Sequence, residues 1–183
     1  TAAIEAAGLA QAQSYLDTIK GAETLASLVT LWSSPGYATP LGGYVSVDAK
    51  QPDRYSVHLG AGGLGLPDRD YYLDETEKGV EIQQKYREYV AFLLGEAGYA
   101  DPTSMAQAVY DLEDRIARTV AWDRAVRRNR DLTYNAVTPA ELAAMAGGFP
   151  VAAMLETSGF DATDRFVVGD LPPTPEEAEE LGL

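Results

Sequence analysis

The most informative stretch of this chain is Gly62-Gly63-Leu64-Gly65-Leu66-Pro67-Asp68-Arg69-Asp70-Tyr71-Tyr72. Helices repeat apolar residues every three to four positions and strands every two, and neither period explains this order. A second unusual run follows at residues 128–142: Arg-Asn-Arg-Asp-Leu-Thr-Tyr-Asn-Ala-Val-Thr-Pro-Ala-Glu-Leu. We therefore treat the two runs as motifs specific to one fold and name them the first and the second motif.

The first motif resembles the L-G-L-P-x-R-D-Y-Y segment in the non-catalytic, helix-rich part of neprilysin-like zinc metallopeptidases, the neprilysin and endothelin-converting enzyme family. The second motif resembles the family's R-N-x-x-L-x-Y-N-x-M-T-x-x-x-L run, and the order and spacing of the two agree with the family. Compatible sequence covers most of the chain. The resemblance implies a structural role for the shared motif positions Gly65, Pro67, Arg69, Asp70, Tyr71, Asn129, Tyr134 and Asn135.

The catalytic motifs of that family are missing from these residues. The family uses a helical H-E-x-x-H and a downstream E-x-x-x-D, whereas this chain has one histidine, His58, set in Ser-Val-His-Leu-Gly. We assign no catalytic, metal-binding or substrate-binding residue, and we expect the isolated chain neither to bind zinc tightly nor to cleave peptides. The resemblance places zinc in the parent enzyme, and its catalytic zinc domain and oligopeptide substrates are the implied partners.

A mainly α fold is predicted, with residues 1–183 forming a single helical domain that is part of a larger substrate-enclosing lobe. Residues 44–48 and 55–59 alternate around the turn-prone residues 50–53, which predicts one small β-hairpin. Residues 160–168 are compatible with one further short strand. The expected architecture is therefore a multi-helix lobe with little sheet.

Helix boundaries follow from apolar spacing and from capping residues. Asp101-Pro102 is typical of an N-cap followed by proline at the first helical position, and Thr138-Pro139-Ala140-Glu141 is a capping box. Helices are predicted at residues 2–20, 23–32, 75–97, 101–120, 138–145 and 150–156. The buried stripe is expected to contain Val80, Tyr86, Tyr89, Val90, Leu93 and Leu94 on the long helix, and Met105, Val109, Leu112, Ile116 and Val120 on the next.

A further capping box lies near the end of the sequence, at Thr174-Pro175-Glu176-Glu177. Only residues 178–183 follow it, and an isolated helix of that length is marginal in water. The pattern suggests a truncated or cleaved polypeptide.

Composition narrows the possible partners. Fourteen Lys and Arg against 28 Asp and Glu give a net charge of −14, which disfavours nucleic acid and anionic membrane surfaces. No apolar run approaches the roughly 20 residues of a bilayer-spanning helix. These residues also contain no basic start followed by an apolar stretch as in a signal peptide, so any export signal is expected to lie outside them. Cysteine is absent, whereas animal members of the family carry disulfides, which favours a bacterial-type member. The resemblance implies an extracytoplasmic location, periplasmic or secreted.

Two glycine- or acid-rich patterns invite other interpretations. Residues 60–65 satisfy G-x-G-x-x-G, but Leu66 and Pro67 follow where a nucleotide-binding loop needs a helix N-terminus, so a tight turn is favoured. Asp68, Asp70 and Asp74 suggest a calcium loop, yet the EF-hand positions five, six and twelve are Tyr72, Leu73 and Gly79. We expect instead that Arg69 and Asp70 form internal charge-assisted hydrogen bonds that fix the loop, so that Asp70→Ala destabilises the chain.

The remaining polar residues also favour structural roles. His58 alone cannot form a metal site or a catalytic triad. The basic residues are interleaved with acids, which favours local pairing over docking of an acidic peptide or nucleic acid; they are Arg115, Arg118, Arg124, Arg127, Arg128 and Arg130. No particular carboxylate pair stands out for glycoside hydrolysis.

The function implied by the resemblance is that of a non-catalytic lobe, which encloses the active-site chamber of a zinc metalloendopeptidase and restricts substrates to oligopeptides. The alternative is a free-standing acidic helical module that binds a peptide or protein without catalysis. An H-E-x-x-H downstream in the reading frame would distinguish the first from the second.

Overall fold

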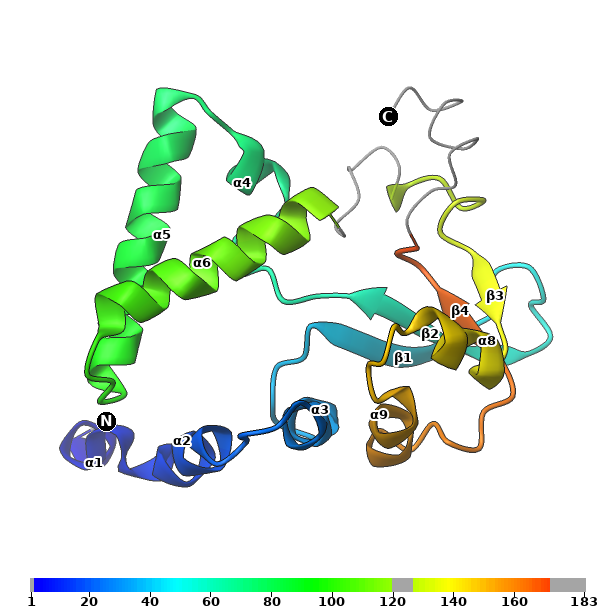
Figure 1. Ribbon diagram of the computed structural model, residues 1–183, viewed down its shortest axis with the longest axis horizontal. Helices are drawn as coiled ribbons and strands as arrows, with labels where there is room; N and C mark the ends of the chain where they lie inside the picture. The colour runs from blue at the N-terminus through cyan, green and yellow to red at the C-terminus, as the bar shows by residue number, and fades with distance from the viewer. Residues whose placement is uncertain (1, 120–126, 172–183) are drawn as a thin grey trace.

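The computed structural model describes residues 2–119 and 127–171, with side chains from residue 5 onward. Two parts are visible in Figure 1. One, the sheet body, is a four-stranded sheet with the helices α3, α8 and α9. The other, the helical arm, consists of α4, α5 and α6 and extends away from the sheet. The first motif leads from the sheet body into the helical arm, and the second motif begins before the chain re-enters the sheet body and continues into it.

The sheet contains strands from both halves of the chain. Its order is β1-β2-β4-β3, formed by β1 (Leu41–Val47), β2 (Tyr55–Ala61), β4 (Phe166–Val168) and β3 (Asn135–Val137). The hairpin β1–β2 is antiparallel, with Tyr44 opposite His58. Strand β4 pairs parallel to β2 and antiparallel to β3. The whole helical arm is therefore inserted between two strands that lie side by side.

Helices cover one face of this sheet and form the main core. They are α3 (Leu25–Ser33), α8 (Pro139–Met145) and α9 (Val151–Thr157). Their apolar faces meet the sheet residues that alternate toward them, in a cluster of Val29, Val57, Leu59, Leu142, Val151, Met154, Leu155, Phe166 and Val168. The period of two in β2 directs Val57 and Leu59 into this core and Ser56 and His58 to the opposite face.

The helical arm is built from α4 (Asp70–Leu73), α5 (Glu77–Glu96) and α6 (Pro102–Thr119). Thr76 caps α5 through its hydroxyl, and Asp101 accepts a hydrogen bond from the Ser104 amide at the start of α6. Helix α4 packs against both long helices. A small second core of Leu66, Tyr72, Tyr110 and Ala117 lies among them.

The N-terminal residues form three short helical pieces: α1 (Ala2–Ala7), the 3-10 helix η1 (Gly8–Gln11) and α2 (Gln13–Lys20). One helix was predicted here, and the break occurs at Gly8, whose φ of 52° is unfavourable for other residues. The Lys20 ammonium lies 4.8 Å from the centre of the Tyr99 ring, which joins α2 to the turn between α5 and α6. None of the helices in the described ranges is both long and apolar enough to cross a membrane.

The mainly α fold with a small sheet is confirmed, as are the hairpin, the strand within residues 160–168 and both internal caps. Strand β3 lies between the helices predicted at residues 101–120 and 138–145, where no strand was predicted, and α4 was not predicted either. The capping box at residues 174–177 lies outside the described residues. Single-domain organisation of residues 1–183 stays a prediction.

The predicted buried stripes on the two long helices were wrong in detail. On α6 the buried residues are Ala106, Tyr110, Glu113 and Ala117, one position from the predicted set. Leu112 is 52% exposed, and on α5 Val80, Tyr89 and Leu93 are also exposed. The reason is that the two helices pack on each other and on α4 through a face rich in tyrosine and small residues. The most apolar faces remain without cover from the described chain.

Gly65 of the first motif is required by the packing of the arm. A Cβ at this position would overlap the Tyr86 hydroxyl and lie 2.7 Å from the ring carbon that bears it. We expect Gly65→Ala to lower the free energy of unfolding by about 1–3 kcal/mol, as overpacking does. Urea unfolding measures this. As the matched control, Gly95→Ala in α5 meets nothing closer than 3.9 Å and should be neutral or stabilising. Equal losses from both variants would contradict the steric explanation.

Candidate functional site

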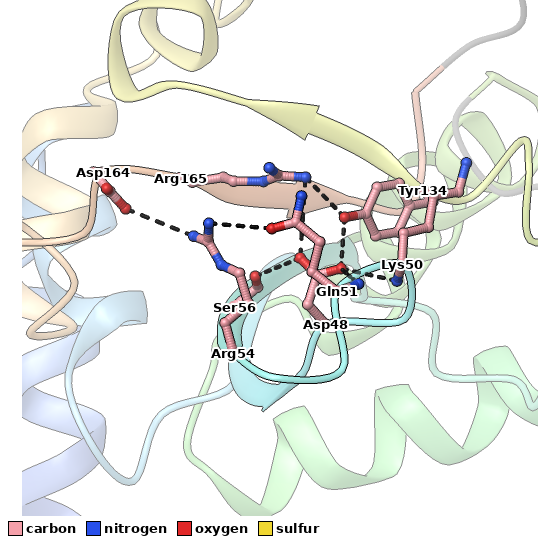
Figure 2. A network of polar contacts seen from close by, with 8 residues as sticks. All are labelled: Asp48, Lys50, Gln51, Arg54, Ser56, Tyr134, Asp164 and Arg165. Atoms are coloured by element: carbon pink, nitrogen blue, oxygen red, sulfur yellow. Dashed lines mark hydrogen bonds and ion pairs between the residues drawn. The ribbon is translucent and has the colours of Figure 1, made fainter.

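The face of the sheet that the helices leave uncovered is organised by one buried carboxylate, Asp48 (Figure 2). Asp48 follows β1 and is fully buried. Its oxygens accept hydrogen bonds from the hydroxyls of Tyr134, at 2.6 Å, and Ser56, at 2.7 Å. The backbone amides of Lys50 and Gln51 donate to it at 2.9 and 3.0 Å. The carboxylate therefore fixes the hairpin turn, β2 and the second motif to one another.

Positive charge surrounds the same group. The Arg165 guanidinium donates to the Tyr134 hydroxyl at 2.8 Å and lies 4.0 Å from Asp48. The Lys50 ammonium lies 4.8 Å from the centre of the Tyr134 ring. The hydrogen bond from Tyr134 is the largest cause that lowers the pKa of Asp48 well below its usual range, against the opposing effect of burial. Asp48 is thus an ionised structural group with its acceptor capacity in use.

A second buried carboxylate, Glu113 of α6, organises the helical arm. The hydroxyls of Tyr72 and Tyr86 each donate to it at 2.9 Å. The Tyr72 oxygen also accepts from the Leu66 amide at 3.0 Å, so one phenol connects the first motif to α6. Burial, reinforced by the neighbouring carboxylate, raises the pKa of both Tyr72 and Tyr86. These phenols stay protonated and act as donors.

The two parts of the molecule are joined by side chains from the two motif regions. Arg127, which precedes the second motif, donates to the carboxylate of Asp68 in the first motif at 2.7 Å. Asp68 is buried, with 7% of its side chain exposed. Near it, Asp170 accepts from the Ala61 amide at 2.7 Å and ties the end of β2 to the chain beyond β4. The motifs that are distant in sequence therefore meet in space.

The predicted positions of the first motif lie as follows. Gly65 gives room to Tyr86, and Pro67 is exposed beside it. Arg69 is half-buried at the residue that precedes α4, and the exposed Tyr71 accepts a hydrogen bond from Gln83 at its carbonyl. Asp70 is exposed in the first turn of α4 and forms no hydrogen bond or ion pair with the described residues. Among the described residues the expected pairing of Asp70 is not found, whereas the neighbouring Asp68 accepts a hydrogen bond from Arg127.

The second motif has a clearer structural function. The Asn129 side chain accepts from the Asp131 amide at 3.0 Å and forms a turn before β3. Tyr134 donates to Asp48, as described above. The Asn135 amide donates to the carbonyls of Leu132 and Val168, at 2.8 and 3.0 Å, where β3 begins to pair with β4. A structural role for these three residues remains a proposal, and these contacts support it.

Sequence reasoning missed Asp48, Glu113 and Arg165, and it placed Tyr86 in the buried stripe without its hydrogen bond to Glu113. For Glu113 a signal existed, because it continues the spacing of Ala106 and Tyr110 on α6 and so shares their buried face. Asp48 follows the hairpin strand directly and resembles an ordinary turn residue. No local pattern marks its partners, which come from four different segments.

An open groove of about 740 Å³ lies beside Asp48 on the uncovered face of the sheet. Tyr44 stacks on His58 along one wall, with ring centres 5.3 Å apart, and Arg127, Arg130 and Asp170 contribute charge. The groove can hold a polar or aromatic side chain by contact. Its carboxylates are already committed to hydrogen bonds, so the arrangement is one for binding rather than for acid–base chemistry.

The described residues contain no group of three His, Cys, Asp or Glu side chains that could hold a metal ion. His58, the chain's one histidine, is stacked on Tyr44 rather than placed beside carboxylates. The residues present therefore do not fit a zinc centre. The three candidate calcium ligands have different surroundings. Asp68 binds Arg127, Asp74 accepts from the Thr76 amide, and Asp70 faces solvent.

The basic residues near the second motif follow the expected pairing only in part. Arg118 pairs with Asp114 one helical turn away, at 2.8 Å, as local pairing predicts. Arg127 instead reaches a distant partner, Asp68. Arg124 lies outside the described residues.

A scaffold of this kind, in which both motifs anchor the backbone, corresponds to an N-terminal segment of a neprilysin-like metallopeptidase. The chain belongs to peptidase family M13, whose N-terminal family model matches residues 1–179. The family that the two motifs indicated is confirmed.

Individual relatives agree with this assignment. Endothelin-converting enzyme 1 of Cavia porcellus is 36% identical over 106 residues, and endothelin-converting enzyme-like 1 of Mus musculus is 33% identical over 99 residues. The alignments cover 56% and 54% of this chain but only 14% and 13% of those proteins. The chain therefore spans a small part of the length of these relatives.

Solved structures show the same fold. The inhibitor complex of Mycobacterium tuberculosis zinc metalloprotease Zmp1 superposes with a TM-score of 0.82 at 30% identity, covering 91% of this chain and 26% of that one. PepO from Lactobacillus rhamnosis superposes with a TM-score of 0.70, covering 96% of this chain and 30% of that one. Its 18% identity supports the fold alone.

Removal of one phenol tests the role of Asp48. Hydrogen bonds lower the folded-state pKa of Asp48. Its contribution to stability is therefore complete above the unfolded pKa of about 4. That contribution is lost as the pH falls from there toward the folded-state pKa. Tyr134→Phe removes the shortest of those bonds, at 2.6 Å. We expect a lower free energy of unfolding at pH 7 and a smaller drop between pH 7 and pH 3, both measured by urea unfolding. Tyr55→Phe, at an exposed hydroxyl, is the matched control, and equal effects of both variants would contradict the prediction.

A pair of neighbouring aspartates tests which one fixes the first motif. Asp68→Asn weakens the hydrogen bond with Arg127 at a buried position and should lower stability by about 1–2 kcal/mol. Asp70→Asn changes an exposed residue and should stay within about 0.5 kcal/mol of the parent. Thermal unfolding of the two variants supplies the comparison. A larger loss at Asp70 would restore the role that the sequence suggested for it.

Proposed function

We propose that this chain is part of the non-catalytic helical lobe of a zinc metalloendopeptidase, and that the lobe encloses the active-site chamber and restricts substrates to oligopeptides. Membership of family M13 supports the peptidase assignment. The structural relative Zmp1 is a zinc metalloprotease, which supports zinc as the metal of the parent enzyme. Size selection requires a wall of fixed shape and no reactive group. The chain suits this role, because its buried carboxylates Asp48 and Glu113 are already occupied by hydrogen bonds.

The observation that carries the proposal is the apolar surface of the helical arm. Phe92 is 61% exposed and Tyr89 57%, and Leu93 and Leu112 are exposed on the same pair of helices. Large exposed apolar patches mark sites where other polypeptide binds. In a relative of which this chain covers about a quarter, much more polypeptide is present. We infer that further chain of the parent protein covers the arm.

In this proposal the peptide bond is cleaved elsewhere. Zinc and the general base would come from the catalytic domain of the parent, where the metal would activate water for peptide hydrolysis. The chain described here supplies a wall, held rigid by Asp48 and Glu113, that positions substrate and excludes bulk water. Following the family resemblance, we place the parent outside the cytoplasm of a bacterium.

Reconstitution tests the proposal. The chain is mixed with the remainder of the parent protein, which would carry the metal ligands, and hydrolysis of a short peptide is followed together with sedimentation. We expect a complex and faster cleavage than with either piece alone. Zinc titration of this chain alone should show no tight stoichiometric site.

Two variants sharpen the result. Phe92→Glu places a charge on the apolar face of the arm and should weaken association by about tenfold or more. Leu25→Glu changes a comparably exposed residue of α3 outside the arm and should have a smaller effect. If the pieces do not associate at micromolar concentration and activity is unchanged, the enclosing lobe is wrong. A free-standing peptide- or protein-binding module would then be favoured.

A further inference from the structure

The outer edge of β1 carries backbone groups that pair with nothing in the described chain. Strand β1 is the first in the sheet order, so one of its sides has no neighbouring strand. In an antiparallel pair, alternate residues bond to the partner and the residues between them direct N–H and C=O away from it. The residues of β1 that direct these groups away from β2 are therefore open to another strand.

Hydrogen bonds at the two ends of the hairpin show which residues of β1 face β2. The Asp48 amide donates to the Arg54 carbonyl at 3.0 Å, and the Gly62 amide donates to the Pro40 carbonyl at 2.8 Å. Even-numbered residues of β1 therefore face β2. The alternation in β2 agrees with this. The carbonyl of Leu59, an odd-numbered residue, faces away from β1 and accepts a hydrogen bond from the Gly169 amide on the β4 side. The odd-numbered residues of β1 accordingly point outward.

One of these outward residues is already satisfied. The Leu41 amide donates to the Thr39 hydroxyl at 3.2 Å, and that hydroxyl donates to the Leu41 carbonyl at 2.7 Å. The Thr39 hydroxyl therefore satisfies the outward N–H and C=O groups of Leu41, the first residue of β1. Three residues remain, Gly43, Val45 and Val47, and no described residue donates to or accepts from their backbone.

The side chains along this edge are also unprotected. Residues 41–47 contain no charged residue and no proline, the features with which exposed edges usually avoid pairing. Val45 is 58% exposed, Val47 47% and the neighbouring Tyr55 71%. An apolar edge with open donors and acceptors is complementary to another extended backbone.

We propose that an extended segment from the remaining polypeptide of the parent protein adds to β1 as a fifth strand, pairing with Gly43, Val45 and Val47. This inference rests on the proposed function, which supplies the longer polypeptide. A second copy of this chain is disfavoured because each copy carries a charge of −14. A transient peptide substrate is disfavoured because it would leave the apolar edge open between catalytic cycles.

Hydrogen exchange at single-residue resolution tests the proposal, by comparing this chain alone with the complete polypeptide. The amides of Gly43, Val45 and Val47 should exchange at least about tenfold more slowly in the complete protein. Tyr44 and Ser46, which bond to β2, and Leu41, which bonds to Thr39, are internal controls and should exchange at similar rates in both.

Each alternative occupant has its own signature. Rapid exchange of the three amides in the complete protein overturns the proposal, and the enclosing lobe still stands if cleavage continues to require this chain. Protection that appears only after a short peptide substrate is added assigns the edge to substrate and also overturns it. Protection in the isolated chain that grows with concentration assigns the edge to a second copy, with the same consequence.

A substitution pair confirms the direction of pairing. Val45→Pro removes the outward N–H while leaving the bonds to β2 intact, a change that edge strands accommodate. In the complete polypeptide it should abolish the protection of Gly43 and Val47. Val45→Thr keeps the N–H and should preserve it. Protection that survives Val45→Pro would show that something other than strand pairing covers the edge.

Discussion

A carboxylate removed from water needs several hydrogen-bond donors to remain ionised, and at Asp48 those donors come from separate segments of the chain. Ser56 lies on β2 and Tyr134 in the second motif. Arg165, immediately before β4, donates to the Tyr134 hydroxyl and lies 4.0 Å from Asp48. These contacts hold together the uncovered face of the sheet, because they join the end of β1 to β2 and to the second motif. Asp48 and Tyr134, joined in this network (Figure 2), also line the groove.

Glu113 applies the same principle in the arm with neutral donors, the phenols of Tyr72 and Tyr86. Between the two centres lies Asp68, paired with Arg127. The acids that organise the described part of the fold, Asp48, Asp68 and Glu113, are thus a small buried subset of the 28 acidic residues in the sequence. Hydroxyl donors are suited to this use, since they satisfy a carboxylate without adding a second buried charge. Such a framework keeps its shape without a metal or a disulfide in the described residues.

Local patterns predicted the elements well and the contacts poorly. Caps at Asp101 and Thr138 fix helix starts through bonds three residues away, so the sequence contains both partners. Strand β3 has only three residues and forms because β4 lies beside it, which no local window reveals. The sequence suggested Asp70 as the paired aspartate of the first motif, whereas the structure pairs Asp68. The reason is the same, since the partner that decides this, Arg127, is far along the chain. Burial on α5 and α6 was misjudged because apolar residues there are not covered by the described chain.

The parallel pairing of β2 with β4 has a consequence for the order of folding. The chain leaves the sheet after β2, builds the whole helical arm, and returns only with β3 and β4 (Figure 1). At synthesis rates of about 5–20 residues per second, the nascent hairpin waits for several seconds with one side of β2 unfilled. The arm consists of local contacts and forms within that interval. Until β4 is made, β2 presents an unpaired side of the kind to which other extended chain can add.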